Sequence, residues 1–217
     1  MTQQNITLVS FGYFGKHFLE KIAEAVKREF AYQVIIKESH IDLSEFFDPG
    51  RRQYNGNKML IAVDKISDEG ALKTIGLFSV DLFIPILTYI FGQAVLNGNT
   101  GIASLYRLSN ERYGIEPDDN LLLERFTKEV VHELGHTFGL IHCSSPTCVM
   151  RSSTYVEDID QKNPGLCNSC HAPAGNTTGV TDVYLTETSS SNPSNTGSGH
   201  WLNCHDSAAS VCPAVRE

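Results

Sequence analysis

The most constraining feature of the sequence is a run of nineteen residues, HELGHTFGLIHCSSPTCVM, at residues 132–150. His132 and His136 are four residues apart, so on a helix their imidazole rings lie one turn apart on the same face. Gly139 can end that helix in a sharp turn, because glycine accepts positive φ, and the turn can bring His142 back towards the other two histidines. Three imidazoles leave one position of a tetrahedral zinc ion open, as in catalytic rather than structural sites.

Glu133 follows the first of these histidines directly. A carboxylate in this position can hold a metal-activated water and take its proton. The short pattern H-E-x-x-H also occurs by chance, in which case its histidines would be ordinary core and surface residues. The longer pattern H-E-x-x-H-x-x-G-x-x-H fixes five positions, so a chance match is far rarer. We therefore predict a catalytic zinc bound by His132, His136 and His142, with Glu133 as the catalytic residue.

Four cysteines form two closely spaced pairs beside this run. Four residues separate Cys143 from Cys148, and two separate Cys167 from Cys170. Such pairs are typical of a four-thiolate zinc site, which has no open position and is therefore structural. Two disulfides or free buried thiols are the alternatives. We see no secretory signal at the start of the sequence and expect a cytoplasmic protein with reduced thiols, which favours zinc.

The pattern of apolar residues predicts an α/β (α+β) fold. A strand at residues 6–12, a helix at 15–30 and a strand at 32–36 form a βαβ unit, which implies parallel strands. Further segments are predicted as a helix at residues 57–66 and strands at 72–78, 87–95 and 102–107. The turn at residues 97–99, Asn-Gly-Asn, indicates a hairpin, so one of the five strands runs antiparallel to its neighbour.

The helix that carries the histidines has its own sequence signals. Residues 117–120, Pro-Asp-Asp-Asn, can cap its first turn. Apolar residues at steps of three and four then predict a buried face, at Leu123, Phe126, Val130 and Leu134.

Residues 77–96 are the most apolar window and are long enough for a membrane span. Asp81, Pro85, Gly92 and Gln93 interrupt it, which favours two buried strands joined by a turn. The net charge is −8 and basic residues are not clustered. Nucleic acids and anionic membranes are therefore not expected as partners.

The composition changes after Cys170. Residues 172–217 are rich in Ser, Asn, Gly and Thr and have little to bury, which predicts a disordered low-complexity tail. Cys204, His205 and Cys212 suggest a third metal site, but the composition around them favours disorder. The folded domain is expected at residues 1–171.

The run HELGHTFGLIHC, followed by CVM and then CNSC, resembles the archaemetzincins, which are zinc peptidases of the metzincin clan. Weaker similarity extends upstream through RRQYN, DLFIP, YIFGQA and LLLERFTKEVV. The resemblance implies a metzincin-like fold in two parts. The N-terminal part, residues 1–139, would contain a mixed, twisted five-stranded sheet and the active-site helix, and the C-terminal part, residues 140–171, would be stabilised by the structural zinc. Met150 would form a turn beneath the catalytic zinc.

The resemblance further implies a zinc metallopeptidase with two Zn²⁺ ions per chain, one catalytic and one structural. Glu133 would be the general base of peptide-bond hydrolysis, and aminopeptidase-like activity is one assignment made in the family. We expect a peptide or protein substrate, aligned along the antiparallel edge strand within residues 87–95, and a monomer. The alternative is a zinc-bound, non-catalytic peptide-binding or regulatory protein, although metal binding alone does not require Glu133.

Overall fold

The computed structural model describes residues 4–68, 70–174 and 201–203 of the chain. Six strands form the main sheet, namely β1 (Asn5–Phe11), β2 (Gln33–Ser39), β5 (Ala71–Phe78), β8 (Gly92–Val95), β9 (Thr100–Ser104) and β10 (Trp201–Asn203). Their order across the sheet is β10-β8-β9-β5-β1-β2. The strands β2, β1, β5 and β9 are parallel, whereas β8 is antiparallel to both β9 and β10. The sheet is therefore mixed, with its antiparallel strands at one side.

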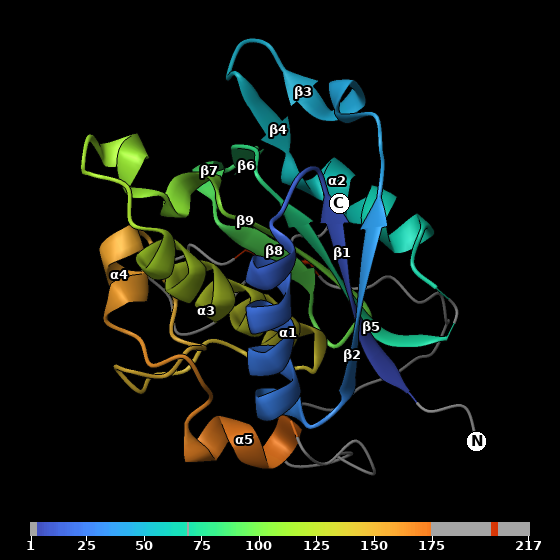
Figure 1. Cartoon of the computed structure of the whole chain (residues 1–217), viewed down its shortest axis with the longest axis vertical. Coiled ribbons are helices and arrows are strands. Elements are labelled where there is room, and N and C mark those ends of the chain that lie inside the picture. The colour runs from blue at the N-terminus through green and yellow to red at the C-terminus, as the bar shows by residue number, and fades with distance from the viewer. Residues whose placement is uncertain (1–3, 69, 175–200, 204–217) are drawn as a thin grey trace, which may run out of the picture.

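Helices cover both faces of this sheet. α1 (Lys16–Phe30) and α3 (Asp119–Thr137) lie on one face (Figure 1), and α2 (Gly56–Lys65) packs on the other. Successive side chains of a strand point to opposite faces, and β1 contributes to both cores for this reason. Ile6 and Leu8 pack with α1 and α3, whereas Val9 and Phe11 pack with α2. Burial on both faces is expected of a central parallel strand.

A second sheet extends from the α2 side. It consists of four short strands in the order β3-β4-β6-β7, with bounds β3 (Phe47–Asp48), β4 (Gln53–Asn55), β6 (Leu82–Ile84) and β7 (Leu87–Ile90). The shorter helices are η1 (Leu43–Phe46), η2 (Tyr106–Leu108), η3 (Asn110–Tyr113), α4 (Val156–Asp160) and α5 (Asn168–Ala174). Among the described residues, no helix is long and apolar enough to cross a membrane.

The second sheet corrects two predictions. The strand predicted at residues 87–95 is two strands, because the chain leaves the second sheet after β7 and enters the main sheet at β8, with the buried Phe91 between them. The window at residues 77–96 accordingly contains the end of β5 and three further strands rather than two. A continuous apolar run shows no change of periodicity where one strand ends and the next begins. The boundary between β7 and β8 therefore cannot be predicted from the sequence pattern.

The remaining elements agree with the predicted α/β fold class, which is confirmed. The five predicted strands all contribute to the main sheet, and β8 and β9 form the predicted hairpin. The Asp118 carboxylate caps α3 by accepting a 2.9 Å hydrogen bond from the main-chain N–H of Leu121. Within the predicted tail, the structure describes residues 172–174 as the end of α5 and 201–203 as β10, which differs from the predicted disorder there. The rest of the tail, including Cys204, His205 and Cys212, lies outside the described residues.

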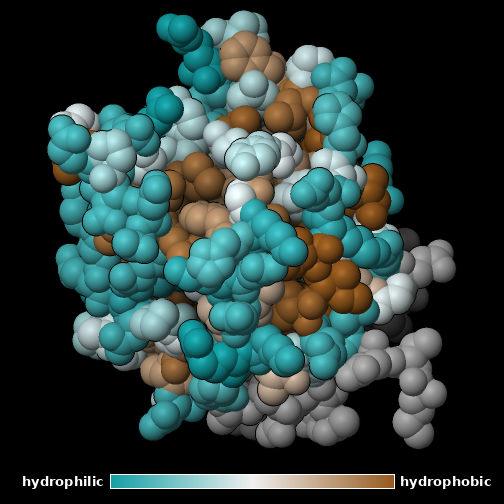
Figure 2. Space-filling view, in the orientation of Figure 1, coloured by the Kyte–Doolittle hydropathy of each residue, from teal (hydrophilic) through white to brown (hydrophobic). Residues whose placement is uncertain are grey.

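The outer surface in the view of Figure 2 is mainly hydrophilic, with an apolar patch on the side where β2 forms the edge of the main sheet. Ile35 and Ile36 of β2 are 40% and 36% exposed. The two edges of the main sheet thus differ in their surroundings. The edge at β2 is partly exposed, whereas the strands β8 and β9 near the opposite edge pack against α3.

Candidate active site and metal centres

The end of α3 brings the three predicted histidines together. His132 and His136 are buried, and their Nε2 atoms are 3.1 Å apart. After the helix, Gly139 has φ of +87°, which turns the chain back on itself. The ring of His142 then lies with its centroid 5.4 Å from that of His132 and 5.0 Å from that of His136. One nitrogen of each ring lies within 4.8 Å of the other two, which is close enough for a shared metal ion.

The hydrogen bonds of these rings show that a cation fits between them. Nδ1 of His132 lies 2.8 Å from the carbonyl oxygen of Val149, and Nδ1 of His136 lies 2.7 Å from that of Leu140. A carbonyl only accepts, so both Nδ1 atoms carry the proton and both Nε2 atoms present lone pairs. Two lone pairs 3.1 Å apart repel each other unless a cation lies between them.

The dimensions of the histidine cluster suit zinc. Two nitrogens bound at about 2.0 Å in a tetrahedral zinc site are about 3.3 Å apart, close to the separation of the two helical Nε2 atoms. The buried Nε2 of His142 has no hydrogen-bond partner within the described part of the chain, so it is available to bind a metal ion in the tautomer whose proton is on Nδ1. The three nitrogens therefore fit a zinc ion and leave its fourth position open.

Burial keeps the three imidazoles neutral. It lowers the pKa of His136 to about 3 and that of His142 to about 4, and it lowers the pKa of His132 well below its ordinary value. The nearby Lys162 cation acts in the same direction on each ring. Neutral imidazoles are the form that binds metal, so the three predicted ligands are in the binding form at neutral pH.

Glu133 lies in a space that a glycine provides. Its side chain is fully buried between α3 and β8. A Cβ atom at Gly92 would come 2.7 Å from both Cγ and Oε1 of Glu133, so only glycine leaves room for the carboxylate here. On the other side of the helix, a Cβ at Gly135 would come 2.4 Å from Sδ of Met150. Close approach at these two glycines brings both β8 and the turn at Met150 against the helix.

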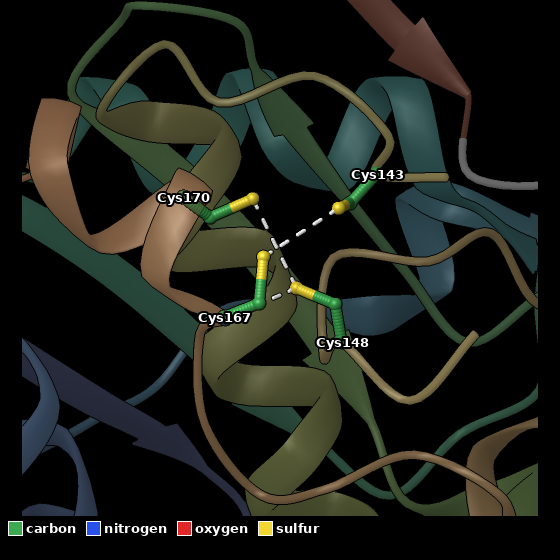
Figure 3. Close-up of side chains that lie close together, drawn as sticks. All are labelled: Cys143, Cys148, Cys167 and Cys170. Atoms are coloured by element: carbon green, nitrogen blue, oxygen red, sulfur yellow. Dashed lines mark hydrogen bonds between the residues drawn. The ribbon is translucent and has the colours of Figure 1, made fainter. Parts of the chain in front are cut away.

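The four predicted cysteines form the second cluster. Figure 3 shows their thiols pointing to a common centre, Cys143 and Cys148 from the loop after α3, Cys167 and Cys170 from the segment that enters α5. Sγ of Cys143 lies 3.8 Å from that of Cys167, and Sγ of Cys148 lies 3.9 Å from that of Cys170. Sulfurs bound at about 2.3 Å to a tetrahedral zinc are about 3.8 Å apart, whereas a disulfide needs about 2.05 Å. The geometry therefore fits a zinc ion, and these cysteines form no disulfides.

The thiols have unequal affinities for protons. A main-chain hydrogen bond involving Cys170 is the largest cause that lowers the pKa of Cys167, to about 7. Burial raises the pKa of Cys148 and of Cys170. Four adjacent thiolates repel one another, so their joint ionisation requires a cation at the centre.

Main-chain hydrogen bonds hold the segments that carry these thiols. The N–H of Asn163 donates to the carbonyl of Thr147 (2.7 Å), and the N–H of Val149 donates to that of Gly165 (3.2 Å). The main-chain N–H of Leu166 donates to the Glu29 carboxylate of α1 at 2.6 Å. These hydrogen bonds thus join the two cysteine-bearing segments to each other and to α1 of the N-terminal part.

The family model described as "Peptidase family M54" matches residues 55–174. The chain belongs to peptidase family M54. It is 37% identical to the archaemetzincin of Thermococcus kodakarensis, over 76% of this chain and 92% of that protein, and 34% identical to that of Saccharolobus solfataricus, over 78% and 92%.

Two solved structures share the fold. The archaemetzincin from Methanopyrus kandleri matches with a TM-score of 0.70 and 32% identity, over 80% of this chain and 94% of that one. A zinc-dependent peptidase from Methanocorpusculum labreanum matches with a TM-score of 0.71 and 28% identity, over 78% of this chain and all of that one. The predicted resemblance and the predicted class, a zinc metallopeptidase, are confirmed.

The structure thus brings together every residue predicted to bind zinc, while the individual roles of these residues stay predictions. Sequence reasoning missed Gly92, Glu129 and Lys162, which surround Glu133 or its neighbours. Glu129 could have been found, because it precedes Glu133 by one helical turn. The sequence offers no local signal for the other two.

Proposed function

We propose that this M54 peptidase hydrolyses peptide bonds at the histidine cluster, with Glu133 as general base. The observation that carries this proposal is a fully buried carboxylate, not needed as a ligand, that directly follows His132 on the helix and faces the glycine of β8. When bound, zinc lowers the pKa of water towards about 7 and polarises a carbonyl. Glu133 takes the proton of the attacking water and returns it to the leaving amine.

We also propose two zinc ions per chain. The histidine cluster supplies three nitrogens and leaves a position for reactants, whereas the cysteine cluster supplies four sulfurs and leaves none. The second ion is therefore structural. Thiols bind zinc only while reduced, which agrees with the predicted cytoplasmic location. The buried Met150, packed against Gly135, would form the turn beneath the catalytic ion.

The edge of β8 that faces away from β9, where β10 pairs in this structure, is the proposed place of the substrate. The N–H of Ser104 donates to the carbonyl of Phe91 (2.8 Å) in the ladder between β9 and β8. Because the direction of main-chain groups alternates along a strand, those of Gly92 and Ala94 point to the opposite edge. A peptide paired with this edge passes Gly92 and hence Glu133, so peptide or protein substrates can align there by main-chain hydrogen bonds.

The strand β10 supports this placement. Its residues pair antiparallel with β8, with Leu202 opposite Ala94 and Asn203 opposite Gln93. The edge therefore accepts an extended, antiparallel segment, and a substrate would take the position that β10 occupies here.

The test compares hydrolysis of a library of internally quenched peptides by wild type, Glu133→Ala and His132→Ala, with zinc content measured for each. Glu133→Ala is expected to keep its zinc and lose turnover on the order of 10²–10⁴-fold, because it removes the proton acceptor. His132→Ala is expected to lose one metal equivalent. Equal turnover by Glu133→Ala and wild type would contradict the catalytic role and favour a non-catalytic peptide-binding protein.

A further inference from the structure

The carboxylate of Glu29 lies against the segment that carries Cys167 and Cys170. Its Oε1 accepts a 2.6 Å hydrogen bond from the main-chain N–H of Leu166, the residue before Cys167. Nε2 of His171, the residue after Cys170, lies 3.6 Å from the same oxygen. Glu29 is therefore in contact with both ends of this cysteine pair, although it lies 137 positions earlier in the chain than Leu166.

A glycine leaves room for this carboxylate. A Cβ atom at Gly165 would come 2.7 Å from Oε2 of Glu29 and 3.2 Å from its Cδ, and the side chain of Glu29 is 14% exposed. The carbonyl of Gly165 in turn accepts a 3.2 Å hydrogen bond from the main-chain N–H of Val149. Val149 belongs to the loop that carries Cys143 and Cys148, so the contact at Glu29 continues through the main chain to the other two thiols.

The position of Glu29 on its own helix is unfavourable for an acidic residue. It is the last residue but one of α1 (Lys16–Phe30). The C-terminal turn of a helix carries a partial negative charge, which favours basic side chains there and disfavours acidic ones. Its neighbours Lys27 and Arg28 follow that preference. The helix is not stabilised by a carboxylate at this place, so the reason for Glu29 lies in its contact with residues 165–171.

The segment that Glu29 contacts has little stability of its own. Figure 1 shows α5 next to the end of α1 from which the chain enters β2. α5 has seven residues, and a helix this short is marginal in water, so its position depends on contacts outside it. The main-chain N–H groups of Cys170 and His171 both donate to the carbonyl of Cys167 at 2.9 Å. These local bonds fix the shape of the turn, whereas the bond to Glu29 fixes its place relative to α1.

A fixed place matters because the thiols bind metal as thiolates. Four adjacent thiolates repel one another, so the segments that carry them must be held together by other contacts whenever zinc is absent. Hydrogen bonds in the surroundings of a metal site orient its ligands and thereby affect metal affinity. The bond from Leu166 to Glu29 is of the stronger, charge-assisted kind, because its acceptor is a carboxylate.

We propose that Glu29 is a positioning residue for the cysteine cluster. Its carboxylate holds residues 165–171 in place relative to α1 and to the loop at residues 143–150, so that the four thiols are arranged before zinc binds. The N-terminal part thereby determines how tightly the C-terminal part holds its metal. This inference rests on the proposed structural zinc, which the same experiment tests separately.

The test uses the full-length protein and measures the affinity of the cysteine cluster for cobalt(II) and zinc by competition with a chelator. Cobalt(II) bound by thiolates absorbs strongly in the near ultraviolet, which distinguishes this cluster from the histidine site. Glu29→Ala removes the acceptor, Glu29→Gln keeps an oxygen acceptor of the same reach, and Gly165→Ala displaces the carboxylate. Glu24→Ala is the matched control, because Glu24 is an exposed glutamate of the same helix.

Glu29→Ala is expected to lower the metal affinity of the cysteine cluster by about 10- to 100-fold, as do changes in other residues that orient metal ligands. Glu29→Gln should recover most of this loss, and Glu24→Ala should have wild-type affinity. Gly165→Ala should lower the affinity of the wild type but not that of Glu29→Ala, because both changes break the same contact. Equal further losses for Gly165→Ala in the two backgrounds would overturn the proposal.

Melting temperatures of the metal-free proteins separate positioning from general stabilisation. A Glu29→Ala protein with a lower melting temperature but wild-type metal affinity would show that the contact only stabilises the fold, and would overturn this inference alone. A wild-type protein without thiolate–cobalt absorption would overturn the proposed structural zinc and this inference with it.

Discussion

The main-chain N–H of Cys143 donates a 2.9 Å hydrogen bond to the carbonyl oxygen of Met150. Cys143 directly follows His142, and Met150 directly follows Val149, whose carbonyl orients His132. The loop between residues 143 and 150 is thus closed at the point where two of the predicted ligands, His132 and His142, are fixed. The same loop carries two of the four thiols, so the two proposed metal centres share one short stretch of backbone.

The first prediction follows from this shared backbone. Cys167→Ser/Cys170→Ser opens the cysteine cluster and removes the contribution to folding of the proposed structural zinc, which is on the order of 10 kcal/mol in small zinc peptides. The loop that positions His142 then loses its restraint. We expect a lower melting temperature and faster loss of zinc from the histidine site, although no histidine is changed. Mass spectrometry of the native protein under mild chelation measures this loss.

The matched control is Cys204→Ser/Cys212→Ser, which makes the same chemical change in the predicted tail and should retain zinc as the wild type does. If the cluster variant loses one zinc ion while the histidine site keeps normal affinity and activity, the two centres are independent and the prediction is wrong.

The second prediction concerns Gly92, the glycine beside the proposed general base Glu133. Gly92→Ala places a methyl group within 2.7 Å of the Glu133 carboxylate and must displace it. Misplacement of a reacting group by about 1 Å can lower the rate on the order of 10²-fold. We expect this loss in kcat with unchanged zinc content. Gly70→Ala is the control, because a Cβ there meets no atom within 4 Å; similar kinetics of the two variants would contradict the role of Gly92.

These contacts show what sequence reasoning could and could not reach. The histidine and cysteine sets were predictable because their spacing is local: a helical period, a glycine at positive φ and two short cysteine pairs fix which atoms converge. The contact between Glu133 and Gly92 was not predictable, because it depends on which strand packs against α3. The break between β7 and β8 was missed for a related reason, since both strands are apolar and only the packing of two sheets separates them.

The third prediction concerns pH and Lys73, which connects the turn after β8 with the end of α3. Its Nζ donates to the carbonyl oxygens of Gly98 (2.7 Å) and Thr137 (2.8 Å). Burial lowers its pKa from 10.5 to about 8. Between these two values the unfolded chain binds a proton that the folded chain does not, so the Lys73 contribution makes the free energy of unfolding rise with pH.

Lys73→Met should therefore flatten the rise in the free energy of unfolding across this pH window, as measured by urea denaturation. It should also lower stability near neutral pH, because two carbonyls lose their donor. The exposed Lys21, changed to Met, serves as control and should leave the slope as it is in the wild type. An unchanged slope in Lys73→Met would show that another group determines the pH dependence.

The last prediction concerns competition for the edge of β8. Leu202 lies opposite Ala94, whose main-chain groups face this edge, so the N–H of Leu202 points towards β8. Leu202→Pro removes that donor and should weaken β10 pairing, which frees the edge and raises kcat/KM for peptides several-fold at constant zinc content. Asn203→Pro should change kcat/KM less, because the direction of main-chain groups alternates along β10 and the N–H of Asn203 points away from β8. Removal of residues 175–217 should keep zinc and raise kcat/KM similarly. A fall in kcat/KM for Leu202→Pro would instead show that β10 supports the active conformation of β8.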